Sequence, residues 1–536
     1  MSVTRARMAF AMNAPALRSA GAAGDVGGAA LLTGEAAGFG VDFTYDTDAT
    51  KRVAVKVSNV VTEYAVDSFF GNAGTSPKQV YNVAGALVWS PHNMCLQSQT
   101  FEQATPWNPT TALTVTANAI AAPDGTLTAD RLVETATTTN HQILHSNITW
   151  VTGETYTISV YAKAGERNWL AITPANTATI ADWFDLTNGV VGTTANGGVM
   201  TSVGSGWYRC SITFVKDATT GGPTIFVRTA NGQTGTYLGD ITKGLYVWGA
   251  QLNRGSAPTA YIPTTTAARF GLALDYDPST HAAKGLRCEP AATNLLLNNA
   301  TLSTQSVTVT AVAHTLSFWG TGTITLSGVS TAGPLVGTGA ANRVSLNFTP
   351  TAGSLTLTVT GTVSAAQLET GSVATSPIPT FAASATRAVD RYNCTPASIN
   401  YSATAGGWWG EFTPLSSLTG SRLVGFANGG CTPMFYNTNL FQQYDSVGTL
   451  DKAVTWAYGA THKMASAYAS GSRAVTGNGA AVTADAGPTA NLLNPGASVN
   501  FGNDGTTPTS PMNGYIRKVF YVPRRMTNAE LATKTT

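Results

Sequence analysis

AQLNRGSAPTAYIPT (250–264) and AQLETGSVATSPIPT (366–380) match at nine of fifteen positions. Each string closes a stretch rich in Thr and Val, and the two stretches also open alike, with NMCLQSQT (93–100) and NLLLNNAT (294–301). A shared opening and closing with different lengths between them indicates two copies of one β module along the chain. Repeated modules present extended surfaces more often than one deep catalytic centre, so the repeat favours binding.

The composition indicates a globular chain built from strands. Only 11% of the residues are charged, against roughly 25% in an average soluble domain, and mean hydropathy is +0.03. Thr, Ser, Ala, Gly and Asn replace the missing charges, and the hydroxyl and β-branched residues among them suit half-buried strands. A net charge of +2 is too weak to recruit nucleic acid. No apolar run reaches the roughly 18 residues of a membrane span, so we expect no membrane insertion.

The five cysteines are widely and irregularly spaced. An odd number without a CxxC pair predicts neither a disulfide framework nor a zinc site. We expect small buried side chains in a protein made in a reducing cytoplasm.

Strand and turn signals divide the chain into six parts. Short alternating strands with turn residues between them, and no helical stretch, predict an all-β chain of tandem β-sandwich (jelly-roll) modules. The only clear helix signal is RRMTNAELATKT near the C-terminus, where Thr527 or Asn528 can cap and Glu530 lies in the first turn. The expected parts are an N-terminal arm and small β attachment domain (1–90), a jelly roll (91–266), a connector (267–292), a shorter β-sandwich module (293–383), a connector (384–394) and a last sandwich (395–536).

Several of these strings resemble bacteriophage virion proteins of the tail-fibre and receptor-binding kind. LYVWGAQLNRGSAPTAYIPT (245–264) is similar to the motif that closes a carbohydrate-binding-module-like jelly roll in that group. HNMCLQSQTFEQATPW (92–107) and EPAATNLLLNNATLSTQ (289–305) resemble its module openings, and GYIRKVFYVPRRMTNAEL (514–531) resembles the end of its concanavalin-A-like, lectin-type domain. The resemblance covers roughly 90–536, and 39–90 more weakly.

The resemblance implies a structural, host-contacting protein located in a virion tail or other external appendage. It implies a homotrimer joined to other virion proteins through the N-terminal segment, and bacterial surface polysaccharide as the partner. Jelly rolls of this type often hold a structural calcium, but the sequence assigns no position to one, and we expect no other cofactor. The shared residues are mostly turn formers and core aromatics, so no sugar-binding site is transferred.

Glycoside hydrolysis normally needs two carboxylates about 5–9 Å apart, and no such pair is evident in the sequence. Glu411 has no acidic partner nearby in sequence. Asp275 and Asp277 have suitable spacing but lie in a connector, where turn formation explains them. Asp182 and Asp185 flank a strand start and would point to opposite faces. We expect no enzyme and no catalytic residue.

Metal binding is weakly supported. His141 and His145 are spaced to share one strand face but lack a third ligand, which favours two ordinary strand histidines. Asp42, Asp46 and Asp48 could contribute oxygens to calcium, but their loop lacks the Gly and bidentate Glu of an EF-hand. The metal content stays unknown at this point.

Sugar recognition uses aromatic rings, because the C–H face of a pyranose stacks on Trp or Tyr. Trp408 and Trp409 are adjacent, so they should face opposite sides of a strand, with one in the core and the other exposed or covered by a neighbouring chain. Trp207 and Trp248 lie in family-like structural strings and are expected in the core. The candidate glycan-binding residues are Trp408, Trp409, Tyr444, Trp456, Trp169 and Trp183.

Taken together with the β modules, the resemblance implies a virion fibre or spike subunit that attaches to host glycans by many weak contacts. One alternative is a purely structural capsid-decoration or baseplate protein whose β modules contact other proteins. A third possibility is a polysaccharide-degrading spike, which would require two carboxylates converging in a cleft.

Overall fold

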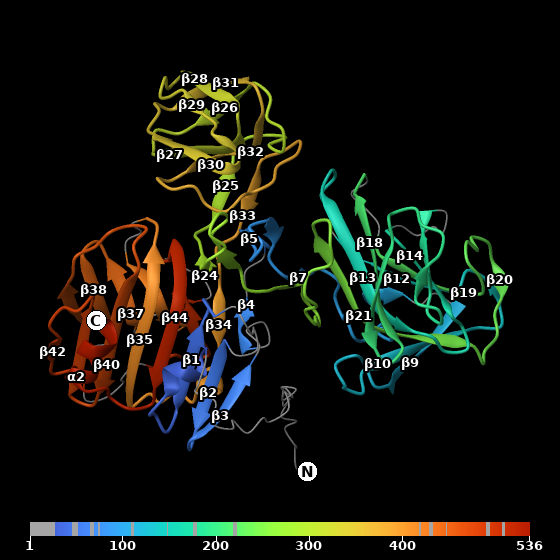
Figure 1. Ribbon diagram of the computed structural model, residues 1–536, viewed down its shortest axis with the longest axis horizontal. Coiled ribbons are helices and arrows are strands. Elements are labelled where there is room, and N and C mark those ends of the chain that lie inside the picture. The colour runs from blue at the N-terminus through green and yellow to red at the C-terminus, as the bar shows by residue number, and fades with distance from the viewer. Residues whose placement is uncertain are drawn as a thin grey trace, which may run out of the picture. The chain divides into compact units, whose positions relative to one another are not determined.

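The computed structural model is almost entirely β, with antiparallel pairing throughout the described sheets (Figure 1). This confirms the predicted fold class. The four cysteines within the described part, Cys95, Cys210, Cys288 and Cys394, are buried free thiols, as expected. The structure describes residues 27–536 except 46–51, 65–68, 73–75, 109–111, 147, 149, 175–179, 218–221, 417–419, 428–431, 446–447, 489–493 and 506–509.

The chain forms two compact units, each made from separate stretches of sequence. Unit 1 contains residues 1–71, 283–288 and 391–536, and unit 2 contains residues 72–282 and 289–390. This division differs from the predicted boundaries, which placed residues 1–90 in a domain of their own. The difference arises because one strand of the N-terminal segment (Gly38–Asp42) hydrogen-bonds to the last strand of the chain. Residues 1–26 of the predicted arm lie outside the described part.

Unit 1 is a two-sheet sandwich. One sheet runs in the order β3-β2-β1-β44-β35-β40-β41-β42, and β24 (Ala283–Cys288) also pairs with β44. The other runs in the order β39-β38-β37-β36-β43-β34-β4. The strands are β1 (Gly38–Asp42), β2 (Val53–Val57), β3 (Val60–Tyr64), β4 (Gly71–Asn72), β34 (Tyr392–Cys394), β35 (Ala405–Pro414), β36 (Ser421–Phe426), β37 (Thr432–Asn437), β38 (Leu440–Asp445), β39 (Gly448–Ala453), β40 (His462–Ala469), β41 (Ser472–Gly477), β42 (Thr483–Asp485), β43 (Val499–Phe501) and β44 (Gly514–Val522).

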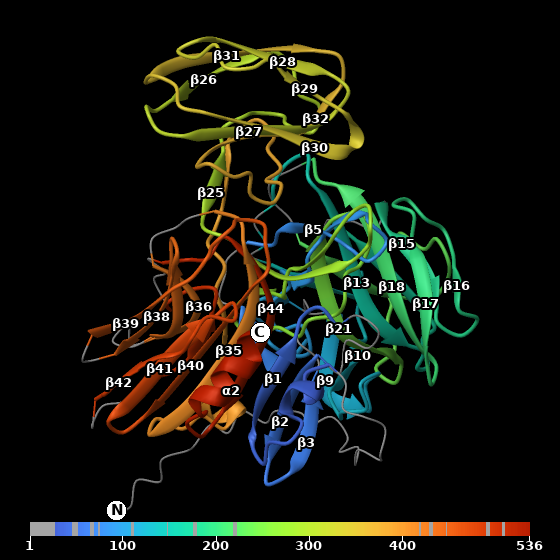
Figure 2. The ribbon, with the colours of Figure 1, turned by 60° about the vertical axis from the view of Figure 1, so that its left-hand side comes forward.

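Helix α2 (Asn528–Thr535) covers part of the outer face of the first sheet, against β35, β40 and β41 (Figure 2). Thr527 is its N-cap, and the Thr527 and Glu530 side chains form a reciprocal capping box, which confirms the helix signal in the sequence. Leu531 points from α2 into an apolar cluster with Leu32 of the short 3-10 helix η1 (Ala29–Leu32). The sheet therefore has apolar packing on both faces.

The first module (residues 91–266, in unit 2) is a sandwich of two six-stranded sheets, which agrees with the predicted jelly roll. The sheet orders are β17-β18-β13-β21-β10-β9 and β16-β15-β14-β19-β12-β8. Their inward side chains form one buried core that includes Trp107, Tyr156 and Leu170. The strands are β8 (Trp107–Asn108), β9 (Leu113–Ile120), β10 (Ala129–Glu134), β12 (Gln142–His145), β13 (Thr155–Lys163), β14 (Trp169–Thr173), β15 (Asp182–Asp185), β16 (Val190–Val191), β17 (Val199–Gly204), β18 (Trp207–Val215), β19 (Thr224–Arg228) and β21 (Gly244–Arg254).

The second module (residues 293–383, also in unit 2) is a smaller version with two layers, drawn in yellow tones in Figure 1. Its sheets run β30-β27-β32 and β26-β31-β28-β29 around a core of Leu, Val and Phe side chains. The strands are β26 (Gln305–Val309), β27 (His314–Gly320), β28 (Thr323–Gly328), β29 (Leu335–Val336), β30 (Gly339–Phe348), β31 (Gly353–Thr360) and β32 (Val363–Thr370).

The repeated strings have a shared structural purpose, which is to fasten the start of each module to its end. In the first module, Asn93 Nδ2 donates to the carbonyls of Ala250 and Ile262, both at 2.9 Å. In the second, Asn294 Nδ2 donates to the carbonyls of Ala366 and Ile378, both at 3.0 Å. We call these two buried asparagines the module clasps.

A second repeated feature lies beside the clasps. Arg209 of the first module donates to the Thr259 carbonyl and lies over the Tyr161 ring. In the second module Arg343 donates to the Thr375 carbonyl and lies over the Trp319 ring. The same contacts at matching places show that the two modules are built alike, which supports the predicted duplication.

Candidate functional site

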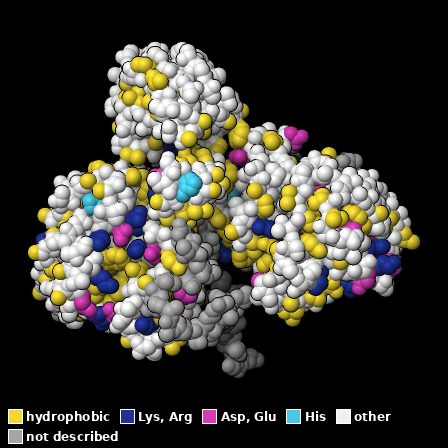
Figure 3. Space-filling model, in the orientation of Figure 1, with side chains coloured by type: hydrophobic (Ala, Val, Ile, Leu, Met, Phe, Trp, Pro, Cys, Tyr) yellow, Lys and Arg dark blue, Asp and Glu magenta, His cyan; other side chains and the backbone are white. Residues whose placement is uncertain are grey.

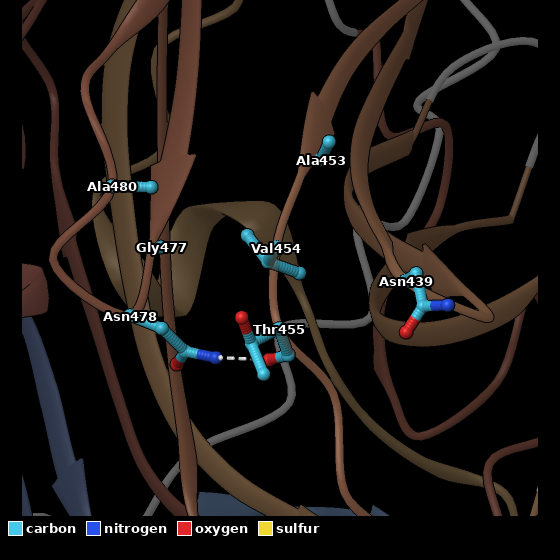
Figure 4. A pocket seen from close by; sticks show the side chains of 7 residues that line it. All are labelled: Asn439, Ala453, Val454, Thr455, Gly477, Asn478 and Ala480. Atoms are coloured by element: carbon cyan, nitrogen blue, oxygen red, sulfur yellow. Dashed lines mark hydrogen bonds between the residues drawn. The ribbon is translucent and has the colours of Figure 1, made fainter.

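An open cavity of about 390 Å³ lies in unit 1, where the ends of β39 and β41 meet the turn between β37 and β38 (Figure 4). Most of its lining is exposed, and Val454 and Gly477 form buried parts of the wall. The lining residues are Asn439, Ala453, Val454, Thr455, Gly477, Asn478 and Ala480. None of these carries a charge, so the cavity offers amide, hydroxyl and backbone groups to a ligand.

Asn478 shapes this cavity. Its Nδ2 donates to the Thr455 carbonyl at 3.1 Å and to His462 Nδ1 at 2.8 Å, and its Oδ1 accepts from the backbone N–H of Lys463 at 3.0 Å. Its φ of 50° is the left-handed conformation that Asn tolerates better than most residues. Residues 439 and 478 both use this conformation, which turns the chain sharply at the cavity rim.

Two aromatic residues, Trp456 and Tyr458, closely follow the lining residue Thr455 in sequence. Trp456 stacks on the His462 ring, with centroids 4.5 Å apart and planes 6° from parallel. It also packs against Tyr436 and is half-buried. Its indole Nε1 is buried and has no hydrogen-bond partner among the described residues. Tyr458 lies next to it, 6.1 Å from the Trp456 ring, and is 44% exposed.

The other aromatic candidates of unit 1 differ in how far they are buried. Tyr444 on β38 is 37% exposed, but it does not line the cavity. Trp408 and Trp409 do point to opposite faces of β35, yet both are buried, at 0% and 7% exposure. The expectation that one of the pair is exposed or covered by a neighbouring chain is therefore wrong. The outer-face residue, Trp409, is covered within the same chain, in the cluster that contains Leu32 and Leu531.

The remaining two candidates come together in the first module. Ala171 of β14 is aligned with Trp183 of β15 on one side and with Phe226 of β19 on the other. These side chains form a small cluster on the outer face of the sheet, with Trp169 packed at its edge. Trp183 is buried and Trp169 is half-exposed, so only Trp169 can contact a ligand in this arrangement. The predicted core positions of Trp207 and Trp248 are confirmed.

The sequence arguments did not identify Tyr458, Asn478 or Arg228, a buried arginine of β19 that is described below. Asn478 precedes Gly479 in an NG pair, a turn signal that marks the rim only when β39 is known to lie beside β41. Tyr458 is one of 18 tyrosines, and its exposure depends on the turn that holds it.

The carboxylates considered for catalysis have structural partners. Glu411 pairs with Arg517 at 2.9 Å, and Asp275 accepts from the backbone N–H of Tyr81 at 2.8 Å. Asp182 accepts from the backbone N–H groups of Ala195 and Asn196, which holds the loop after β16. These contacts favour roles in folding.

Of the histidine and aspartate candidates for metal binding, some form hydrogen bonds within the protein and others lie outside the described residues. His141 Nδ1 contacts the Ala112 carbonyl at 2.7 Å, while His145 Nε2 accepts from the Leu96 N–H at 2.9 Å. Burial lowers the pKa of His145 to about 4, so the ring is neutral at physiological pH. Asp46 and Asp48 lie outside the described residues. Across the described ranges, no group of three or more His, Cys, Asp or Glu side chains could hold a metal ion.

Charged side chains are sparse on the face of the molecule drawn in Figure 3, as the composition predicts. Among the described helices, none has the length and apolar character needed to cross a membrane.

Comparison with known proteins gives neither a family model nor a curated relative that matches this chain. Among solved structures, the chain is similar to the CBM40 module of a Ruminococcus gnavus sialidase bound to sialyllactose (13% identity, 25% of this chain and 84% of that one, TM-score 0.22). It is also similar to a putative carbohydrate-binding protein from Bacteroides ovatus (9% identity, 46% of this chain and 85% of that one, TM-score 0.24). A third similar structure is that of domains LG4-5 of the mouse laminin α1 chain (8% identity, 77% of this chain and 93% of that one, TM-score 0.19). Values this low leave the function to be argued from the residues themselves.

Proposed function

We propose that this protein binds glycans and that the unit 1 cavity is one of its binding sites. The observation that carries the proposal is an open cavity whose uncharged lining includes the amide side chains of Asn439 and Asn478. A volume of about 390 Å³ lies in the range of small-molecule pockets and exceeds the space that one sugar ring needs.

The chemistry of the cavity suits a neutral sugar. Sugar hydroxyls both donate and accept, and amide and backbone groups offer the complementary atoms without the desolvation cost of a full charge. Tyr458 lies outside the lining but is exposed, and its ring offers a surface on which the C–H face of a pyranose can stack. Trp169 and Tyr444 are further half-exposed or exposed aromatic positions for sugar contact elsewhere on the chain.

We place this binding in a bacteriophage virion, as a tail fibre or spike subunit that attaches to host surface polysaccharide without cleaving it. The support is the resemblance of the module openings and closings to tail-fibre proteins. Assembly as a homotrimer would multiply weak contacts into firm attachment through effective concentration. The N-terminal segment would join the other virion proteins.

The first test uses the intact chain and host surface polysaccharide. Ala453 lines the cavity and is exposed, so Ala453→Trp fills the cavity with little disturbance of the core. Ala403 is also exposed but lies outside the lining, and Ala403→Trp is the matched control. We expect at least tenfold weaker polysaccharide binding in A453W and unchanged binding in A403W.

The same assay separates the alternatives. If wild-type protein leaves the polysaccharide at full length, attachment without hydrolysis is supported, whereas shortened chains would reveal a degrading spike. Equal binding by A453W and A403W would remove the cavity from the binding surface. No binding by properly folded wild-type protein would favour the purely structural virion role.

A further inference from the structure

Arg228, on the outer face of the first module, has a buried guanidinium that lacks an acidic partner. The alternation of β19 places Val227 in the module core and Arg228 on the opposite side of the sheet. The register aligns Arg228 with Trp169 of β14, and Trp169 in turn with Asp185 of β15. A half-exposed indole thus stands directly beside a buried cation.

Only one edge of this guanidinium is in use. Nη1 donates to Asn140 Oδ1 at 3.1 Å and to the Gly235 carbonyl at 3.3 Å, and the group lies 4.3 Å from the Phe226 ring centroid. Nε and Nη2 are buried and have no hydrogen-bond partner among the described residues. Burial lowers the pKa of Arg228 to about 10, so the group is still protonated at neutral pH.

No carboxylate of the module supplies the missing contact. In the described part of residues 91–266, the ion pairs join Glu134, Glu154, Glu166 and Asp240 to other cations. The undescribed residues of this range (109–111, 147, 149, 175–179 and 218–221) include neither Asp nor Glu. A buried charge without a counterion is unfavourable, so the site favours an incoming anion.

The module itself shows what the Nε and Nη2 edge of an arginine holds. Arg167 uses this edge for Glu134, with Nε–Oε1 at 2.7 Å and Nη2–Oε2 at 2.8 Å. This two-bond fork fits a planar carboxylate better than a single hydroxyl. Arg228 offers the same fork, but the protein provides no carboxylate to occupy it.

We propose that the first module binds a carboxylate-bearing sugar, with the acid group on the Nε and Nη2 edge of Arg228 and the sugar ring on Trp169. The proposal rests on the proposed glycan-binding function and specifies an acidic sugar at a second site, separate from the unit 1 cavity. Because the Nε and Nη2 edge is buried, binding of the acid group requires local movement of the residues around Arg228.

The test compares matched monosaccharides on the intact chain by ligand-observed NMR titration. Glucuronate and galacturonate each differ from glucose and galactose in the acid group, so the comparison isolates the carboxylate. We expect the uronates to bind at least tenfold more tightly than the neutral hexoses. Arg228→Gln should abolish this preference, and Arg228→Lys, which keeps the charge but loses the fork, should retain only part of it. The control is Arg131→Gln, because Arg131 is already paired with Glu166 and should not affect the preference.

Equal affinity of wild-type protein for uronates and hexoses would overturn the proposal, as would a preference that survives in a folded R228Q. If R228Q does not fold, the wild-type comparison and R228K still decide. The outcome is independent of the cavity test. A preference for uronates that depends on Arg228, with unaltered polysaccharide binding in A453W, would retain this site and reject the cavity. No preference for uronates, with weakened polysaccharide binding in A453W, would retain the cavity and reject this site.

Discussion

Trp408 and Trp409 illustrate how burial decides the role of a single residue. Their alternation on β35 follows from strand geometry and needs no tertiary information. Whether a given face is solvent-exposed depends on α2 and η1, whose residues lie about 120 positions after and 380 positions before this strand. Sequence reasoning therefore identified the opposite orientations correctly but failed to anticipate the second layer of packing.

This burial makes Trp409 a stability residue. Replacing Trp409 with Ala should leave a cavity in the Leu32–Leu531 cluster and lower the free energy of unfolding of unit 1 by about 3–5 kcal/mol. Tyr444→Ala, at a 37% exposed position, should cost less than about 1 kcal/mol. Differential scanning calorimetry of the intact chain measures both. Equal effects from the two variants would contradict the assignment of Trp409 to the core.

At the scale of elements, helix α2 was predictable in position and capping but not in its contacts. Thr527 and Glu530 carry the local capping signal. Arg524 adds a contact that the capping pattern does not include, since it binds Glu530 at 2.7 Å and also Glu35 from the N-terminal segment. A pairing over such a sequence distance leaves no periodic signal in either segment.

The Arg524–Glu530 pair predicts how the docking of α2 depends on pH. Hydrogen bonding to Arg524 lowers the pKa of Glu530 from 4.5 to about 2. A depressed carboxyl pKa gives stability that is present above pH 4.5 and is lost as pH falls toward 2. The pair is largely exposed, so salt should reduce the effect. Thermal unfolding of wild type and Glu530→Gln across pH 2–6 measures the effect. The difference in Tm between the two proteins should narrow as pH falls. A constant gap would contradict the prediction.

At the scale of the whole molecule, buried charges connect distant parts of unit 2. Lys78 forms ion pairs with Asp390 and with Glu289, the latter at 3.3 Å, and Arg387 also binds Glu289. All four side chains are buried, and burial raises the pKa of Asp390 even though Lys78 and Arg387 oppose that change. Residues 78, 289 and 390 lie close to the positions where the chain passes between the units.

Removing one member of this buried cluster should be costly. Lys78→Met removes the buried ion pairs of Lys78 with Asp390 and Glu289 and leaves Arg387 as the remaining cation of the cluster, and we expect a loss of about 3–5 kcal/mol in the stability of unit 2. Lys243→Met breaks an exposed pair with Asp240 and should cost less than about 1 kcal/mol. Calorimetry of the intact chain, together with limited proteolysis, measures the loss of stability in each of the two variants. A Lys78→Met protein as stable as Lys243→Met would show that the cluster contributes little.

The amino-acid sequence by itself determined the all-β class, the duplicated module and the capped C-terminal helix, because alternation, turn residues and caps are local signals. Asn93 and Asn294 belong to strings that were recognisable as repeats, although their hydrogen bonds across the module were not. Only the tertiary structure decided that β1 pairs with β44, that Trp409 is buried, and that Arg228 lies beside Trp169 with no carboxylate bound to its guanidinium. These features depend on pairing between strands far apart in sequence, which no local pattern specifies.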